Sequence, residues 1–248
     1  GYAMKKKIWL LDGGMGQELI KNSKSDPHPL WSTYVMLEEP GLVRKAHVDF
    51  IEAGASVITL NTYSTTPERL EANGLLDKFS FFQKKAIDLA REAIDHTQKN
   101  VLIAGCLPPL VASYRPDKAP EYERCVDLYK QIGPEQESFV DLFICETMAS
   151  IKEAKAAVLA AKTSGKSVWC GLTLEDNEKC ELRSGEKLIE SVNELQSLGQ
   201  EEFLLNCSFP EVIDKGMKIL SQNAKFFGGY GNGFTSIDQL KTASNVYV

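Results

Sequence analysis

The chain has 248 residues, of which 43% are hydrophobic and 25% are charged. This composition is typical of a folded globular protein and excludes disordered, collagen-like and disulfide-framework chains. The formal net charge is −6, and apart from Lys5 to Lys7 the basic residues are scattered, so no nucleic-acid partner is expected. No apolar run approaches the ~18 residues of a membrane span, and no signal peptide is recognisable. We therefore expect a cytoplasmic protein without a membrane partner.

The sequence predicts one domain over residues 4–248. Three residues precede Met4, and we interpret them as an expression remnant. No Pro/Ser-rich linker or low-complexity stretch interrupts the rest of the chain. The cysteines show no CxxC spacing and are expected to be reduced thiols, at positions 106, 125, 145, 170, 180 and 207. A homo-oligomer is compatible with this sequence.

Short apolar or β-branched runs alternate with segments of helical periodicity along the chain. The expected strands are residues 7–11, 56–60, 101–105, 141–145, 167–172, 202–205 and 225–228. The expected helices are residues 40–53, 77–98, 121–131, 151–164, 187–198, 210–221 and 236–243. This alternation predicts parallel strands joined by helical crossovers.

Two α/β architectures fit this pattern, a doubly wound open sheet and a (β/α)₈ barrel. The ends of the strands favour the barrel, because polar or reactive residues follow one strand after another and a barrel gathers them at one mouth. These residues are Asp12, Asn61, Cys106, Glu146, Asn206 with Cys207, and Tyr230 with Asn232. The chain ends at residue 248 before an eighth unit could be built, so we expect a barrel whose last unit is missing.

A glycine-rich turn, Asp12-Gly13-Gly14-Met15-Gly16, directly follows the first strand. Its glycines allow backbone N–H groups to approach an anion, while Asp12 offers a carboxylate to a cation. This pairing of charges suits an amino acid. A tight turn or a nucleotide loop is the alternative, although the spacing is not that of a dinucleotide-binding fold.

Glu146 follows an apolar strand, where a carboxylate is costly unless a cation meets it. A substrate ammonium or a structural salt bridge would both satisfy it. Asn61, Thr62 and Tyr63 could supply uncharged hydrogen bonds to a substrate carboxylate or orient Glu146, and Asn61 and Thr62 could instead cap their loop. Cys207 ends a strand beside Asn206, where a thiolate could bind a metal or act as a nucleophile. A metal ligand is favoured, because no histidine is placed to activate a nucleophile; one cysteine alone cannot hold zinc.

The motifs taken in order resemble the homocysteine-binding domain of the homocysteine S-methyltransferase family. The resemblance runs from about residue 8 to the end, and Leu182-Arg-Ser-Gly-Glu186 also fits. The motifs are Asp12-Gly-Gly-Met-Gly16, Pro29-Leu-Trp31, His47-Val-Asp-Phe-Ile-Glu-Ala-Gly-Ala55, Asn61-Thr-Tyr63, Glu146-Thr147, Asn206-Cys207 and Tyr230-Gly-Asn232.

The resemblance implies a (β/α)₈ barrel that binds zinc through three cysteines and methylates the sulfur of homocysteine, forming methionine. Cys207 would be the first zinc ligand, and Asp12 and Glu146 would bind the homocysteine ammonium. Gly13 and Thr62 would help to hold its carboxylate. The donor would be small, with S-methylmethionine or S-adenosylmethionine favoured over betaine.

The chain departs from the family after Cys207, because it has no further cysteine and lacks the Gly-Gly-Cys-Cys motif. We expect the native chain to be longer, its tail unordered without zinc, and zinc at Cys207 incompletely ligated in this form. Two alternatives stay open: a metal-independent barrel enzyme that uses Asp12 and Glu146, with residues 228–233 binding phosphate, and a non-catalytic amino-acid-binding protein.

Overall fold

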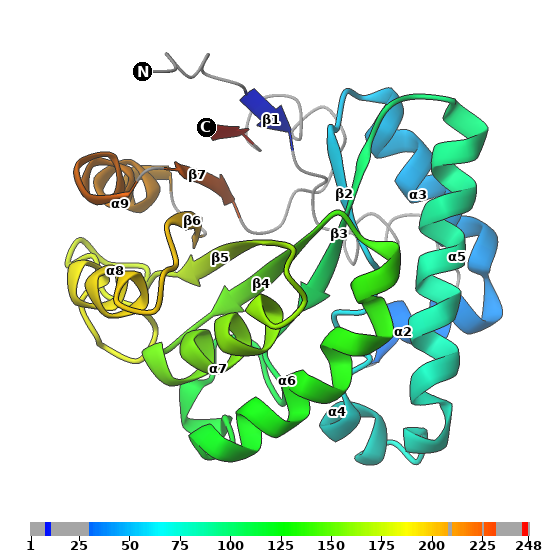
Figure 1. Cartoon of the computed structure of the whole chain (residues 1–248), viewed down its shortest axis with the longest axis horizontal. Helices are drawn as coiled ribbons and strands as arrows, with labels where there is room; N and C mark the ends of the chain where they lie inside the picture. The colour runs from blue at the N-terminus through cyan, green and yellow to red at the C-terminus, as the bar shows by residue number, and fades with distance from the viewer. Residues whose placement is uncertain (1–7, 11–29, 208–209, 225, 232–244, 248) are drawn as a thin grey trace.

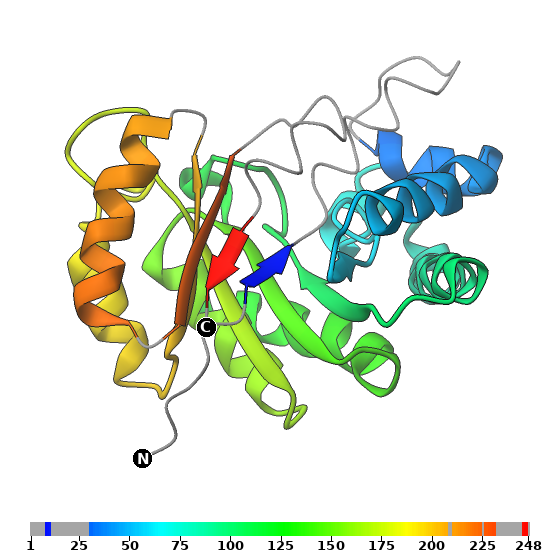
Figure 2. The ribbon, with the colours of Figure 1, turned by 90° about the horizontal axis from the view of Figure 1, so that it is seen from above.

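The computed structural model describes residues 8–10, 30–207, 210–224, 226–231 and 245–247. Six parallel strands form a curled partial barrel, whose outer side is covered by helices (Figures 1 and 2). In chain order the parallel strands are β2 (Val57–Thr59), β3 (Leu102–Leu107), β4 (Leu142–Met148), β5 (Ser167–Thr173), β6 (Glu202–Cys207) and β7 (Phe226–Gly231). The predicted barrel class is confirmed, and the doubly wound alternative is not.

Helices connect the successive parallel strands as crossovers, and additional helices lie in the first part of the chain. They are α2 (Trp31–Glu38), α3 (Pro40–Glu52), α4 (Pro67–Glu71), α5 (Phe79–Thr97), α6 (Tyr122–Gln136), α7 (Ile151–Lys162), α8 (Leu188–Gln196) and α9 (Pro210–Asn223). Short 3₁₀ turns lie at Leu76–Lys78, Pro116–Lys118 and Glu137–Phe139. Among the described residues, no helix is both long and apolar enough to cross a membrane.

Two further strands complete the sheet, in the order β1-β8-β7-β6-β5-β4-β3-β2. The strand β8 (Asn245–Tyr247) pairs antiparallel with both β1 (Ile8–Leu10) and β7. The seam that a missing eighth unit would leave between the first and seventh strands is thus occupied by β8. A single extended segment can present one hydrogen-bonding edge to each neighbour, so it fills the seam without an eighth parallel unit.

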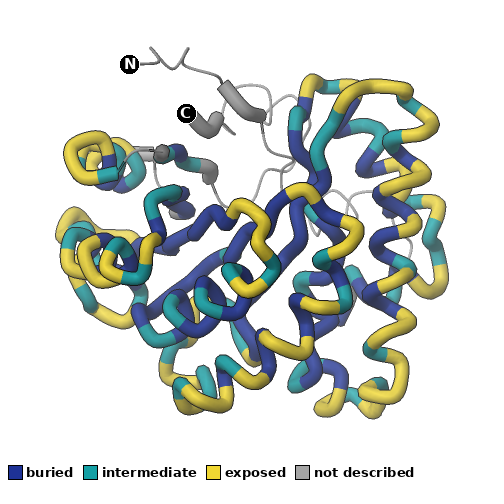
Figure 3. Tube along the Cα trace, viewed as in Figure 1, coloured by how far each residue is buried: buried dark blue, intermediate teal, exposed yellow. Residues whose placement is uncertain are grey.

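Alternation along the strands separates two apolar layers. Outward residues pack against the helices and form the main core, which includes Ile103, Phe143 and Phe203. Inward residues form a smaller cluster inside the curl: Val57, Ala104, Leu142, Ile144, Trp169 and Leu204. The strands are accordingly buried, while the outer faces of the helices are exposed (Figure 3). The sheet thus has an apolar interior below its mouth.

Some helices differ from the sequence-based expectation. The helices α2 and α4 were not predicted, because α2 buries polar Thr33 among apolar residues and α4 has only five residues. The predicted helix 121–131 continues through Pro134 to Gln136, although proline removes one backbone hydrogen bond. The predicted helix 236–243 lies outside the described residues.

Helix α7 begins with Ser150 as its N-cap residue. The Ser150 hydroxyl accepts a hydrogen bond from the Glu153 N–H at 3.2 Å and donates to the Glu153 carboxylate, also at 3.2 Å. Glu153 is only 2% exposed, and burial raises the pKa of its carboxyl to about 7. Ser150 and the nearby charges of Lys152 and Arg69 oppose this rise in pKa only partly.

This burial predicts a pH-dependent contribution to stability. Because the folded-state pKa of Glu153 lies above the unfolded value near 4.5, its contribution falls as pH rises from about 4.5 to 7. We expect Glu153→Gln to stabilise the protein by about 1–3 kcal/mol at pH 8 and by little at pH 5. Urea unfolding at the two pH values measures this difference. An equal effect at both would contradict the assigned pKa.

Candidate active site

Polar side chains occupy the inner face of four neighbouring strands at their C-terminal ends. Cys106 follows Ala104 by two residues on β3, and Glu146 follows Ile144 by two on β4. On β5 and β6, Thr173 lies opposite Asn206 in the strand register. Because side chains two residues apart share a face, these groups lie above the apolar interior cluster. Of the residues predicted to gather at one mouth, Cys106, Glu146 and Asn206 share this inner face.

A β-bulge near the end of β4 changes the direction of the strand around Glu146. Between Cys145 and Met148 this strand advances three residues while β5 advances two, from Cys170 to Leu172. Thr147 accommodates the extra residue with φ of 56°, in the left-handed region that a β-branched residue seldom adopts. The neighbouring inner-face groups Cys106, Thr173 and Asn206 are buried, whereas Glu146 is partly accessible.

The Glu146 carboxylate accepts a hydrogen bond from the Cys106 thiol, with Sγ and Oε2 2.9 Å apart. Burial raises the pKa of Glu146, and the Cys106 bond lowers it part of the way back. No ion pair to Glu146 is found among the described residues. A ligand cation entering the mouth would therefore improve the environment of this carboxylate.

The loop after β2 carries Asn61 and Thr62, which are 4% and 1% exposed. The Asn61 amide donates to the backbone carbonyl of Ser32 at 3.2 Å. Thr62 instead lies within reach of a buried side-chain amide, that of Gln136, at 3.3 Å. Asn61 thus ties its loop to α2, and its role toward a substrate stays a prediction.

Tyr63 follows Thr62 in the same loop, where burial and, to a smaller extent, the nearby Glu146 carboxylate raise the pKa of its phenol. Its hydroxyl is 2.6 Å from Ser113 Oγ, and the Arg69 guanidinium lies 5.6 Å from its ring centroid. Arg69 also donates two hydrogen bonds to the Pro109 carbonyl, at 3.3 and 3.1 Å. Burial raises the pKa of Tyr63, so the phenol stays protonated.

Arg183 bridges two loops at the rim near Asn206. Its guanidinium lies 4.8 Å from the Tyr114 ring centroid and 3.4 Å from the Asp176 carboxylate. Its Nε donates to Thr173 Oγ1 at 3.4 Å, and Thr173 in turn reaches Asn206 Oδ1 at 3.4 Å. The loops after β3 and β5 are thereby tied together beside the inner-face polar groups.

Asp12 and Gly13 lie outside the described residues. Cys207 is the last residue of β6, but its side chain is also outside the description, so its role as a metal ligand stays a prediction. Within the described part of the chain, no three potential ligand side chains cluster around a metal position. Cys145 and Cys170 belong to the main apolar core outside the sheet, and burial raises the pKa of both thiols, that of Cys170 to about 12.

Two buried glutamines support the site and were not predicted. Gln136 ends α6, and Gln83 lies on α5. Gln83 had a recognisable signal, since it stands four residues after Phe79 and three before Ala86 on the apolar face of its helix. Gln136 had none, because it lies beyond the predicted end of its helix.

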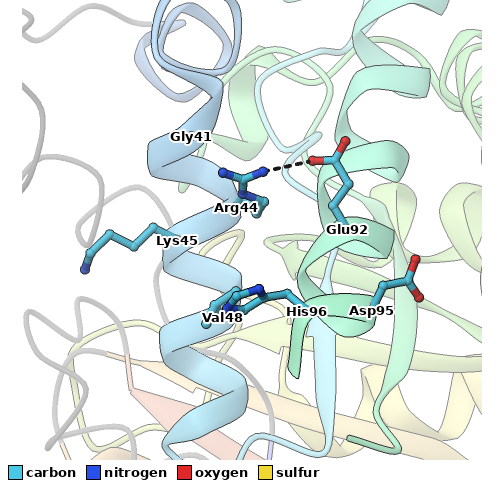
Figure 4. Close-up of a pocket in the computed structure, with 7 residues that line it drawn as sticks. All are labelled: Gly41, Arg44, Lys45, Val48, Glu92, Asp95 and His96. Atoms are coloured by element: carbon cyan, nitrogen blue, oxygen red, sulfur yellow. Dashed lines mark ion pairs between the residues drawn. The ribbon is translucent and has the colours of Figure 1, made fainter. Parts of the chain in front are cut away.

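A groove of about 620 Å³ lies on the outer helical layer, between α3 and α5. Arg44 and Glu92 face each other across it at 3.8 Å, with Val48 and His96 further along (Figure 4). None of the predicted site residues lines this groove. It is therefore separate from the mouth.

The profile of the homocysteine S-methyltransferase family matches residues 9–246. The chain belongs to this family. It is 32% identical over 193 residues to homocysteine S-methyltransferase of Escherichia coli, covering 70% of this chain and 61% of that protein. It is 28% identical to homocysteine S-methyltransferase 2 of Zea mays, over 82% of this chain and 67% of the relative. The chain thus spans less than two thirds of the E. coli protein.

A solved structure gives the same fold. The metallated form of the E. coli homocysteine methyltransferase MmuM has a TM-score of 0.80 and 25% identity, with 95% of this chain and 88% of that chain covered. The family predicted from the sequence motifs is therefore confirmed. The partial barrel of this chain superposes on most of the solved methyltransferase structure.

The Cys106 contact predicts the titration of Glu146. Removing the thiol by Cys106→Ala should raise the pKa of Glu146 by about one pH unit, because a hydrogen bond to the charged form is lost. Cys106→Ser keeps a donor and serves as the control. Carbon-13 NMR of glutamate-labelled protein, with Glu146→Gln to assign the signal, measures the pKa. An unchanged pKa in Cys106→Ala would show that the thiol does not act on the carboxylate.

Proposed function

We propose that this protein transfers a methyl group from a small sulfonium or quaternary ammonium donor to the sulfur of homocysteine, forming methionine. S-methylmethionine or S-adenosylmethionine is the favoured donor, and betaine is the less favoured one. The observation that carries the proposal is Glu146, a partly buried carboxylate without a described ion-pair partner, at the mouth of a barrel of this family.

Glu146 supports recognition of an amino acid at this mouth. Its carboxylate would bind the homocysteine ammonium together with Asp12, while Gly13, Asn61 and Thr62 hold the substrate carboxylate. Asn206 would orient the substrate near Cys207. The named relatives of E. coli and Zea mays are homocysteine S-methyltransferases, which supports homocysteine as the methyl acceptor.

In the proposed reaction, the homocysteine sulfur attacks the donor methyl carbon in line. With a sulfonium donor, the bond between that carbon and the donor sulfur breaks and the donor leaves as a neutral thioether; with betaine, the carbon–nitrogen bond breaks and a tertiary amine leaves. The homocysteine thiol proton passes to solvent. The described residues would bind and orient the amino-acid portion, and positioning supplies much of the rate in such a two-substrate reaction.

Zinc is part of the proposal on the basis of Cys207 and of the metallated form of the E. coli structure. When bound, it would keep the substrate sulfur deprotonated at neutral pH. Cys207 is the proposed ligand from this chain. The described residues contribute no further ligands, so they do not by themselves make a zinc site.

Transfer of a radiolabelled methyl group to homocysteine tests the function, with zinc supplied. We expect Glu146→Gln to raise KM for homocysteine about tenfold or more, because it removes the charge that meets the ammonium. Cys207→Ala and a chelator should each abolish transfer. Initial rates with S-methylmethionine, S-adenosylmethionine and betaine identify the donor.

Matched variants control for damage to the fold. Glu153→Gln removes another buried carboxylate and Cys170→Ala another thiol, and both should keep transfer near the wild-type rate. Homocysteine binding without transfer, indifferent to zinc and to Cys207→Ala, would instead indicate an amino-acid-binding protein. Transfer that survives both Cys207→Ala and the chelator would overturn the zinc-dependent mechanism.

A further inference from the structure

Gln136 contacts two parts of the candidate site, strand β3 and the loop after β2. Its side chain is fully buried, and its Oε1 accepts the Cys106 backbone N–H at 2.9 Å. Its amide nitrogen lies 3.3 Å from Thr62 Oγ1, 2.7 Å from Gln83 Oε1 and 3.5 Å from the Cys106 carbonyl. One amide therefore connects α6, α5, β3 and the loop after β2.

The amide takes the place of a neighbouring strand. Pairing between β2 and β3 ends near Ala104, whose carbonyl accepts the Leu60 N–H at 3.0 Å. Two residues later, the backbone N–H and carbonyl of Cys106 form hydrogen bonds with the Gln136 side chain instead of with a residue of β2. The chain after β2 is thereby free to diverge from the sheet, and this divergence puts Thr62 beside the mouth.

Gly105 makes room for this arrangement. A Cβ atom there would lie 2.9 Å from Gln136 Oε1 and 2.6 Å from the Phe143 ring. Both distances are shorter than a side chain tolerates, so a residue other than glycine would displace the amide or the ring. The position next to Cys106 is therefore compatible with Gln136 only as glycine.

We infer that Gln136 is a positioning residue that sets the spacing between Thr62 and the Cys106–Glu146 pair, and so determines affinity for the amino-acid portion of homocysteine. The chain of contacts runs from Gln136 to Thr62 Oγ1 on one side. On the other side it runs through the Cys106 backbone to the thiol that donates to Glu146 at 2.9 Å. This inference rests on the proposed function, in which Thr62 and Glu146 bind opposite charges of the substrate.

Gln83 reinforces the same connection. It accepts from Gln136 and donates to Thr65 Oγ1 at 2.8 Å, and Thr65 Oγ1 donates to the Thr62 carbonyl at 3.0 Å. Thr62 is thus fixed through both its side chain and its backbone. Because each group in this buried network needs its partners, loss of Gln136 should loosen the whole loop.

Gln136→Met in the full chain tests the inference, since methionine fills a similar volume without an amide. We expect KM and Kd for homocysteine to rise about tenfold, with KM for the donor within about twofold of wild type. Calorimetry measures the homocysteine Kd, and steady-state transfer measures both KM values. If Gln136→Met does not fold, Gln136→Glu replaces it, because it keeps the acceptor oxygen opposite the Cys106 N–H.

Gln200 provides the matched control. It is another fully buried glutamine, whose amide donates to the Val168 and Glu202 carbonyls at 2.7 and 2.8 Å. These contacts lie at the N-terminal ends of β5 and β6, away from the mouth. Gln200→Met should lower stability and leave both KM values unchanged. Equal effects of the two variants on homocysteine binding would overturn the inference.

A second readout separates this inference from the proposed function. Gln136→Met should accelerate hydrogen exchange of the Cys106 amide and change the pKa of Glu146, whether or not homocysteine is the ligand. If wild-type protein neither binds nor methylates homocysteine, the proposed function fails. If the Cys106 amide and Glu146 are unchanged in Gln136→Met, the positioning role fails.

Discussion

The arrangement of this site depends on one constraint, the alternation of side chains along parallel strands. In each strand the last inward residue must lie at the same end of the barrel, above apolar residues such as Ile144 and Leu204. A polar group in that position has little water around it and needs a partner from a neighbouring strand or helix. Glu146 meets Cys106, and Asn206 meets Thr173, for this reason.

The same constraint explains why the proposed site would favour a substrate that carries a positive charge. A partly buried carboxylate is less favourable as an anion than one in water, which is why the pKa of Glu146 is raised. A substrate ammonium offsets that desolvation, so binding and deprotonation of Glu146 favour each other. A thiol without an ammonium group cannot offset the desolvation of Glu146. Such a thiol should therefore bind more weakly than homocysteine.

The sequence predicted the strands, and the polar residues that directly follow them, from the periodicity of apolar residues. The strands were predicted because apolar runs recur between helical segments, and Glu146 and Asn206 were found because each directly follows such a run. Thr173 was missed, since the predicted strand stopped at Leu172, one residue before the inward position that matters. Gln136 could not be predicted, because its role depends on where β2 leaves the sheet, and that is a property of tertiary structure.

Three of the proposed site groups come from parts of the chain that the structure does not describe. Asp12, Gly13 and the Cys207 side chain lie outside the described residues, so the sequence motifs remain the evidence for their roles. The family assignment does not depend on them alone, because the profile match extends over residues 9–246. The fold and the family are therefore shown, while the site at the mouth stays a proposal that rests on the described inner-face residues and the sequence motifs.

The left-handed backbone of Thr147 has a consequence for how this protein could be engineered. A β-branched residue at φ of 56° stores on the order of 1–2 kcal/mol of conformational strain, and glycine would release it. A directed-evolution campaign that rewarded only heat resistance would favour that replacement. The relaxed bulge would hold the adjacent carboxylate less firmly, so the more heat-resistant variants would lose part of the proposed substrate binding.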